Sequence, residues 1–284
     1  MNSIRHLSKN TFSSLHNRSF RLYFTGQIIS QCGSWMQTIA QDWLVLSLTN
    51  SGLQLGLITA LQFIPVLLFA PFGGVIADRF PKRKLIYITQ VAFGLLALGL
   101  GTLVLLDAIQ LWMLYIFAFV FGIINAADKP IRQTFMHEMV EQDQLHNAVA
   151  LTAVQFNVAR IVGPALAGAL IAVVGIGVCF IINGISFVAV IISLMLMRAS
   201  DLSASVLVPK AKGQLMEGFR YIIRTPFLRN SLVIMTIVGT FSYEFNVSLP
   251  LLAKFTFNGN ADSYAALTSS LGAGAVIGGL YAAS

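Results

Sequence analysis

One stretch of the 284-residue chain decides the fold: it reads GVIADRFPKRK, from Gly74 to Lys84. An apolar run over residues 53–77 ends inside this stretch, and basic residues crowd the positions that follow. A helix of about 20 apolar residues crosses the roughly 30 Å hydrocarbon core of a bilayer, and basic residues near its end resist translocation. The stretch therefore predicts a transmembrane helix that ends in a cytoplasmic loop.

The composition of the whole chain indicates the same class. Apolar residues make up 56% of it and charged residues only 10%. A soluble globular domain carries about 25% charged residues, and a disordered chain is far less apolar. The formal net charge of +7 does not indicate a nucleic-acid partner, because the basic residues lie in short segments between apolar runs. A polytopic membrane protein surrounded by lipid is the class that remains.

Apolar runs recur along the chain and alternate with very short and with longer, charged connections. We expect eight transmembrane helices, at residues 21–48, 53–77, 85–106, 109–127, 147–174, 177–197, 229–252 and from 263 onward. The long polar segment after the sixth helix predicts three parts. These are a six-helix bundle over 1–197, a cytoplasmic central loop over 198–228, and the first two helices of a second, incomplete bundle over 229–284.

The distribution of basic residues predicts the orientation. Of the 18 Lys and Arg, Lys254 lies on one side of the expected helices and Arg160 lies within one of them, which leaves 16 on the other side. Cytoplasmic loops carry the excess of Lys and Arg, so we expect the N-terminus in the cytoplasm. We expect no removable signal peptide, since no short apolar segment with a cleavage site precedes residue 21.

The stretch from Gly74 to Lys84 resembles the cytoplasmic loop 2-3 motif of the major facilitator superfamily, Gly-x-x-x-Asp-Arg-x-Gly-Arg-x-Arg/Lys, with Pro81 in place of the second Gly. The resemblance implies two six-helix bundles, of which about eight helices are present here. Gly74 would allow a close helix approach, and Asp78 would accept a charge or backbone donors across the bundle. The basic cluster would hold the loop in the cytoplasm; it consists of Arg79, Lys82, Arg83 and Lys84. The alternative is a loop that only sets the topology.

Residues 128–134 and 157–168 resemble the loop 4-5 region and fifth helix of the exporter branch that includes bacterial enterobactin exporters and macrolide-efflux proteins. Gly163, Pro164 and Gly168 are similar to the core of the antiporter motif of drug exporters. The motif implies a bend and a close helix contact, because proline leaves a carbonyl four residues back unpaired. An ordinary kinked transmembrane helix is the alternative.

Three charged residues fall inside expected helices: Asp42, Arg160 and Glu244. Each costs free energy in lipid unless it is paired or hydrated, so such residues usually face a bundle interior. Polar residues accompany them, namely Gln27, Gln31, Gln37 and Gln41, which we interpret as one stripe, and Asn157. The set predicts a hydrated central cavity in which Glu244 is the favoured proton-coupling acid and Asp42 the second choice. Hydrogen bonding between helices is the alternative role for the glutamines.

The function predicted is secondary active transport by alternating access: a monomeric, proton-coupled exporter of a small amphipathic molecule of the drug or siderophore type, in a bacterial inner membrane. No enzymatic activity, metal or cofactor is expected, since Glu141 stands where the zinc helix begun by His137 and Glu138 would need a second histidine. Three alternatives remain open: an importer of a small solute, a lysolipid flippase, and a scaffold or receptor on the same fold.

Overall fold

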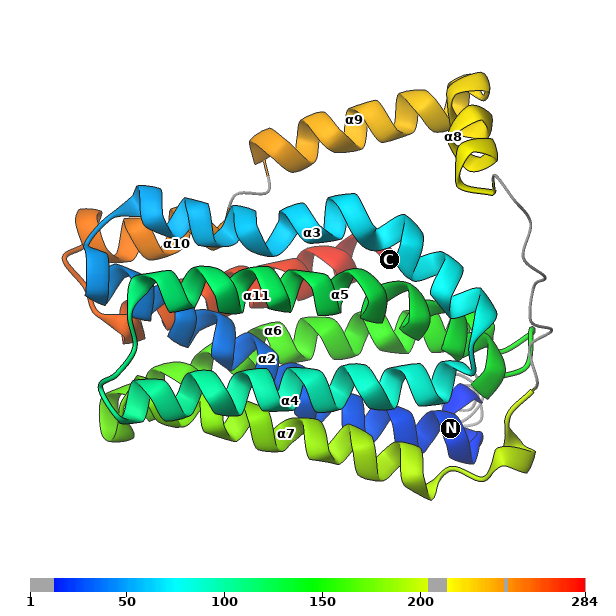
Figure 1. Cartoon of the computed structure of the whole chain (residues 1–284), viewed down its shortest axis with the longest axis horizontal. Helices are drawn as coiled ribbons and strands as arrows, with labels where there is room; N and C mark the ends of the chain where they lie inside the picture. Colours follow the sequence, from blue (N-terminus) through cyan, green and yellow to red (C-terminus); the bar gives the residue numbers. More distant parts are fainter. Residues whose placement is uncertain (1–12, 204–213, 243–244, 284) are drawn as a thin grey trace.

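Every element that the computed structural model describes is a helix (Figure 1), and the described residues are 13–203, 214–242 and 245–283. In chain order the elements are η1 Ser13–His16, α2 Arg18–Thr49, α3 Gly52–Arg79, α4 Lys82–Leu105, α5 Leu111–Met139, α6 Leu145–Val174, α7 Ile176–Leu196, η2 Ala199–Asp201, α8 Gln214–Arg224, α9 Pro226–Ser242, α10 Phe245–Leu251, η3 Leu252–Thr256 and α11 Ala261–Ala283. The expected all-α class is confirmed. Helices are one of the two backbone structures that satisfy their own hydrogen bonds within lipid.

Helices α2 to α7 form a bundle in which α2 packs against both α6 and α7, α3 packs against α5, and α4 packs against α7 and α5. Their connections define two ends. The short-loop end carries residues 50–51, 106–110 and 175, and the charged-loop end carries residues 80–81 and 140–144. Among the described residues, α3 to α7 are each long and apolar enough to cross a membrane. Helix α2 is long enough at 32 residues but contains four glutamines.

The expected end of the fourth helix at residue 127 is wrong, because α5 continues to Met139. Buried apolar residues explain the extension: Ile131, Phe135 and Met139 follow each other at four-residue spacing and face the bundle core. Residues 128–139 were expected in a loop because the continuous apolar run stops before Asp128. The extra turns keep one amphipathic face, and they carry charged side chains into the bundle.

The second group of helices returns to the bundle at the short-loop end. Helix α11 packs against α6 and α2, and α10 packs against α3. The expected seventh helix over 229–252 is described as two helices, α9 and α10, on either side of residues 243–244, which lie outside the described residues. Helix α9 stands apart from α3 in Figure 1, at 95° to α8, with apolar side chains such as Ile234 and Met235 exposed.

Of the two adjacent glycines on α3, Gly73 lies against another helix, α5, whereas the close helix approach was expected at Gly74. A Cβ atom on Gly73 would lie 2.3 Å from the carbonyl oxygen of Ala126, whereas a Cβ on Gly74 would meet no atom within 4 Å. Adjacent residues of a helix point about 100° apart, so only one of the two glycines can face α5. The glycine of the motif that begins at Gly74 therefore does not make this contact.

We predict that Gly73→Ala and Gly74→Ala change stability in opposite directions. Both replacements gain up to about 1 kcal/mol of helix propensity. Only alanine at 73 overlaps a backbone atom, at an expected cost of roughly 1–3 kcal/mol. Thermal unfolding of the purified protein in detergent should show a lower midpoint for Gly73→Ala and an equal or higher one for Gly74→Ala. Equal midpoints for the two variants would contradict the assigned contact.

Candidate functional site

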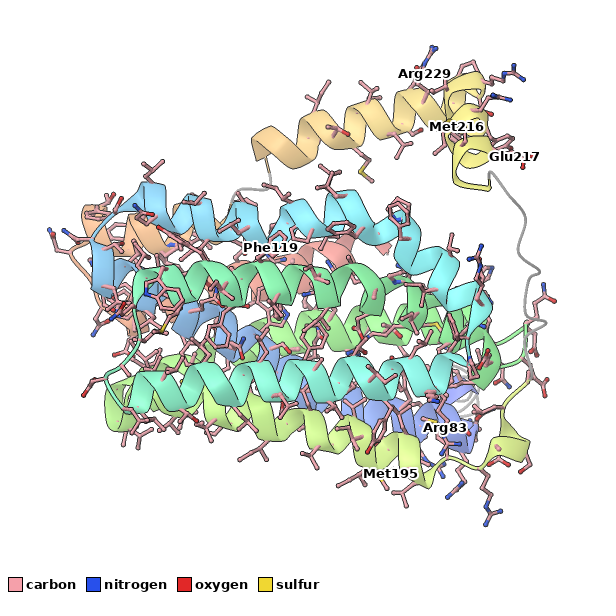
Figure 2. All side chains as sticks on the ribbon, viewed as in Figure 1. Arg83, Phe119, Met195, Met216, Glu217 and Arg229 are labelled. Atoms are coloured by element: carbon pink, nitrogen blue, oxygen red, sulfur yellow. The ribbon has the colours of Figure 1, made fainter. Side chains whose placement is uncertain are left out.

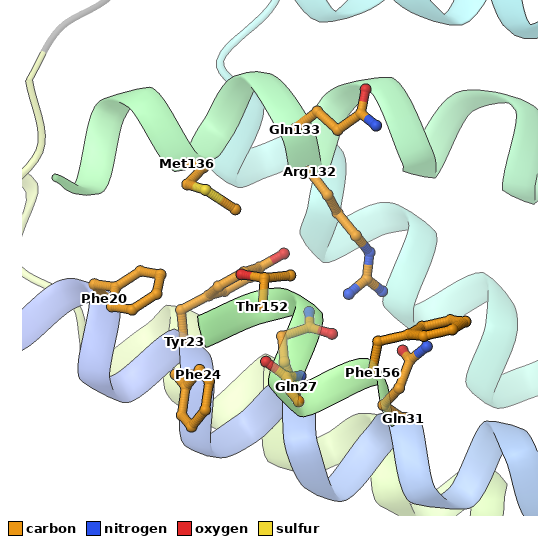
Figure 3. A pocket seen from close by; sticks show the side chains of 11 residues that line it. Phe20, Tyr23, Phe24, Gln27, Gln31, Arg132, Gln133, Met136, Thr152 and Phe156 are labelled. Carbon is orange, nitrogen blue, oxygen red and sulfur yellow. The ribbon is translucent and has the colours of Figure 1, made fainter. Parts of the chain in front are cut away.

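A cavity of about 150 Å³ lies between α2, α5 and α6 in the half of the bundle nearer the charged-loop end (Figure 3). Helix α2 contributes one wall, the extended part of α5 a second, and the start of α6 a third. The residues that line the cavity are Phe20, Tyr23, Phe24, Gln27, Gln31, Arg132, Gln133, Met136, Thr152, Gln155 and Phe156. Its walls thus combine four aromatic rings and four glutamine amides with one arginine, one methionine and one threonine.

A buried carboxylate fixes the position of the arginine. Asp128 and Arg132 form an ion pair within α5, in which the Nε of Arg132 donates to Asp128 Oδ2. From α4, the Thr89 hydroxyl donates to Asp128 Oδ1 at 2.5 Å and the Gln90 amide donates to the same oxygen at 3.1 Å. The Asp128 side chain is 5% exposed. The Thr89 and Gln90 donors join α4 to α5, and together with Arg132 they satisfy both carboxylate oxygens.

The guanidinium of Arg132 points from α5 toward α2, where it approaches Tyr23 and Gln27 (Figure 3). Gln27 is only 4% exposed, and its Nε2 atom has no hydrogen-bond partner among the described residues. A buried donor without a partner costs free energy comparable to a lost hydrogen bond. The cavity therefore holds an amide donor and a guanidinium on facing walls.

The predicted stripe of glutamines on α2 is split between two faces. Gln27 and Gln31 line the cavity. Gln37 faces α7 instead, where its Oε1 accepts a hydrogen bond from Asn183 at 2.6 Å. Six residues separate Gln31 from Gln37, a rotation of about 240° around the helix, so the two cannot share a face. Gln37 serves helix packing, which was the alternative role.

Arg160 lies on α6 next to the cavity, and its guanidinium is 5.8 Å from the centre of the Trp35 ring. The Trp35 ring in turn packs edge-to-face on Phe156, with centroids 5.6 Å apart. The Nε of Arg160 is buried without a hydrogen-bond partner, and no acidic residue in the described part of the chain pairs with it. Arg160 and Asp42, both expected around the central cavity, are not paired with each other.

Asp42 lies toward the short-loop end, away from the cavity. It is 6% exposed and accepts a hydrogen bond from the Tyr264 hydroxyl of α11 at 2.7 Å. Its carboxylate is therefore enclosed by protein and not freely hydrated. Nearby, Lys254 donates its Nζ to the backbone oxygen of Leu46 at 2.5 Å. Glu244, the favoured acid, lies outside the described residues.

The expected gating residues lie at two helix contacts and at the charged-loop end. A Cβ on Gly163 would be 2.5 Å from the Cβ of Trp35, and a Cβ on Gly168 would be 3.0 Å from that of Ala265. Helix α6 thus approaches α2 closely at one point and α11 at another, with Pro164 buried inside the helix.

In the basic loop, Lys82 is buried and pairs with Glu138 of α5 at 2.8 Å. Asp78, Arg79, Arg83 and Lys84 form no ion pair with any described residue. The expected partner of Asp78 across the bundle is therefore not among the residues that the structure describes.

The remaining candidates contribute less to the cavity. Asn157 donates its side-chain amide to Ala153 of its own helix at 2.9 Å. A second cavity, of about 290 Å³, lies between α4 and α7 at the charged-loop end, at the edge where Figure 2 labels Arg83 and Met195. Within the described ranges, no group of three or more His, Cys, Asp or Glu side chains could hold a metal ion.

Sequence reasoning missed the ion pair of Asp128 with Arg132, together with Tyr23 and Thr152 of the cavity. Both charged residues were assigned to a loop because they follow the apolar run. Two signals could have placed them on a helix. They lie four residues apart with opposite charges, and buried apolar residues continue at helical spacing beyond them.

A helical membrane bundle with a cavity between its helices is the architecture of the major facilitator superfamily. The chain belongs to this superfamily, in the family described as transmembrane secretion effector, which matches residues 9–284. The fold agrees with that of solved transporters. A bacterial homologue of the human lysosomal transporter Spinster, in an inward-facing and unoccupied conformation, superposes with a TM-score of 0.68 at 17% identity, over 92% of this chain and 60% of that one.

Curated relatives are transporters as well. The chain is 29% identical to the staphyloferrin A transporter of Staphylococcus aureus over 62% of its own length and 45% of that protein. It is 24% identical to macrolide efflux protein A of Streptococcus pyogenes, over 92% and 65%, and 24% identical to the enterobactin exporter of Shigella boydii, over 92% and 62%. The chain thus spans about half to two-thirds of the length of these relatives, and the resemblance to the exporter branch is confirmed.

We predict that Arg132→Gln destabilises the protein and that adding Asp128→Asn restores most of the loss. Removing one partner of a buried ion pair costs roughly 3–5 kcal/mol, since the other charge stays buried. Asparagine at 128 carries no charge, so the double variant avoids that cost. Unfolding in a mixed-micelle titration should give this order of stability. A double variant no more stable than Arg132→Gln would show that the carboxylate does not depend on Arg132.

Proposed function

We propose that the protein is a secondary active exporter that works by alternating access. One observation carries this proposal: helices α10 and α11 contact the six-helix bundle at the short-loop end, whereas the cavity lies in the opposite half. A transporter of this type alternates between two arrangements around a fixed central site. In this proposal, the contacts at the short-loop end belong to the arrangement that is closed there.

Several contacts close the short-loop end. The hydrogen bond from Tyr264 to Asp42 joins α11 to α2. Lys254 joins the π-helical turn η3 to α2 through the oxygen of Leu46 and lies 5.8 Å from the centre of the Trp43 ring. Because Asp42 and Tyr264 are buried, this hydrogen bond is shielded from water and is worth more than an exposed one.

The contact between α6 and α11 extends to the middle of the bundle and then stops. The Ser269 hydroxyl donates to the backbone oxygen of Ile161 at 3.1 Å, and Gly272 also lies against Ile161. Further along α11, Ala275, which follows Gly272 by three residues on the same side of the helix, is exposed, and Ile277 is 69% exposed. The two helices therefore separate toward the charged-loop end, where a substrate could reach the cavity.

The relatives support export and indicate the class of substrate. Two of them are named for efflux or export and one for transport of a siderophore. The aromatic walls and the amides of the cavity suit a small amphipathic molecule. An importer or a lysolipid flippase on the same fold would show the opposite direction or a lipid substrate in transport assays. A scaffold or receptor would show no flux.

The direction of export follows from the proposed orientation. The basic loops place the charged-loop end, and the N-terminus with it, in the cytoplasm of a bacterial cell, so the cavity opens inward and loads from the cytoplasm. Proton entry would drive the cycle. We propose Glu244 as the acid that carries the proton and a monomer as the working unit. Asp42 would act in closure, since its carboxylate is held by Tyr264.

We predict that expression of the chain in a bacterial strain without its own exporters lowers intracellular accumulation of at least one macrolide or siderophore severalfold. Radiolabelled or fluorescent compounds measure this directly. Gly163→Leu should lose the effect at normal expression, because its side chain would overlap Trp35 and Cys32 of α2. Raised accumulation would indicate an importer. Unchanged accumulation across the panel would reject the proposal.

We predict that Glu244→Gln abolishes transport driven by a pH gradient while substrate binding survives. Glutamine has a similar shape but cannot carry the proton. Asp42→Asn should keep the dependence on the gradient, and Arg160→Ala should damage binding and transport together. Inverted vesicles with an imposed pH gradient measure all three. Full proton dependence in Glu244→Gln together with its loss in Asp42→Asn would move the coupling site to α2.

A further inference from the structure

Two side chains that line the cavity, Gln27 and Arg132, offer it hydrogen-bond donors. Gln27 Nε2 is buried without a partner, and Gln27 lines the cavity. Arg132 uses its Nε on Asp128, so its terminal nitrogens face Tyr23 and the cavity (Figure 3). A guanidinium offers five N–H donors and no acceptor. A ligand that fits this site must therefore supply acceptor oxygens at this point.

Both oxygens of the Asp128 carboxylate already accept hydrogen bonds. Asp128 Oδ1 accepts from Thr89 and Gln90, and Oδ2 accepts from Arg132. Asp128 does not line the cavity, and none of the described lining residues is acidic. A cationic ligand would meet the guanidinium without a compensating acid. The electrostatics of the lining thus favour a negative group.

The size and walls of the cavity limit what accompanies the negative group. At about 150 Å³, it is smaller than the roughly 300–1,000 Å³ pockets that enclose drug-sized ligands. Phe20, Phe24 and Phe156 surround it with aromatic surface. It would accordingly enclose one end of a larger molecule, with an aromatic ring against aromatic walls.

We propose that the cavity binds the carboxylate-bearing aromatic end of an amphipathic substrate, with Arg132 and Gln27 as the donors. Charge-assisted hydrogen bonds to a carboxylate are about twice as strong as neutral ones, and a guanidinium matches the two oxygens in one plane. That the bound molecule is transported rests on the proposed function. Binding to the cavity does not depend on it.

Three probes of similar shape test the charge preference: benzoate, benzamide and benzylammonium. Saturation-transfer difference NMR on the full chain in lipid nanodiscs measures weak binding of each. We expect benzoate to bind about tenfold or more tightly than benzamide, and benzylammonium to bind least. Equal affinity of benzoate and benzamide, or tighter binding of benzylammonium, would overturn the proposal.

Two leucine variants test the location. Gln27→Leu should weaken benzoate binding severalfold while leaving the thermal midpoint equal or higher, since it removes a buried donor that has no partner. Gln37→Leu is the matched control on α2, because Gln37 faces α7 and does not line the cavity. It should lower the midpoint by breaking the bond with Asn183 and leave benzoate affinity unchanged. Unchanged affinity in Gln27→Leu, or a loss in Gln37→Leu alone, would place the site elsewhere.

The binding test and the accumulation assay can give negative results independently of each other. Selective benzoate binding that depends on Gln27, without efflux of any compound, would leave the cavity assignment standing and reject the transport function. Efflux without any preference for benzoate would do the reverse. Each result therefore bears on one of the two proposals alone.

Discussion

Close approach between helices at small residues is the constraint on which the rest of the bundle depends. Lipid tails solvate apolar side chains as well as a neighbouring helix does, so helices in a membrane associate through packing and hydrogen bonds. At Gly163, α6 comes so near α2 that an added Cβ would overlap the Cβ of Trp35. Near this contact, Phe156 packs edge-to-face on Trp35 and lines the cavity. The packing distance between α2 and α6 thus bears directly on one residue of the cavity wall.

Much of the fold could be predicted because lipid imposes a length on each apolar run. The first six helices lie close to their expected ranges, and the error at the end of α5 has a physical cause. An apolar run marks the part of a helix that lies in lipid. The last turns of α5 are amphipathic and pack against other helices, so the helix continues beyond its apolar run. Which of two adjacent glycines meets a neighbour depends on the rotation of the helix. The directions of Gly73 and Gly74 differ by about 100° around the helix axis, and the composition of the segment does not tell which of the two faces a neighbour.

The candidate site was predicted only in part, because charges inside helices signal burial without giving position. Arg160 and Asp42 were interpreted as one polar centre, yet the first lies beside the cavity and the second at the short-loop end. Along α2 alone, Gln27 and Asp42 are separated by about 22 Å of helix. The two tasks proposed for these regions, binding and closure, would therefore share one signature in the sequence. Their separation allows one to change without disturbing the other.

The contact of Lys254 with the backbone oxygen of Leu46 has an evolutionary consequence. Every residue type offers a carbonyl oxygen, so position 46 can change its side chain without losing the bond. Coupled substitutions arise where two side chains must match, and here only one side chain is involved. Comparison of homologous sequences would then show the lysine alone, with no covarying partner. A contact of this kind can be found in atomic coordinates but leaves no covariation signal in a sequence alignment.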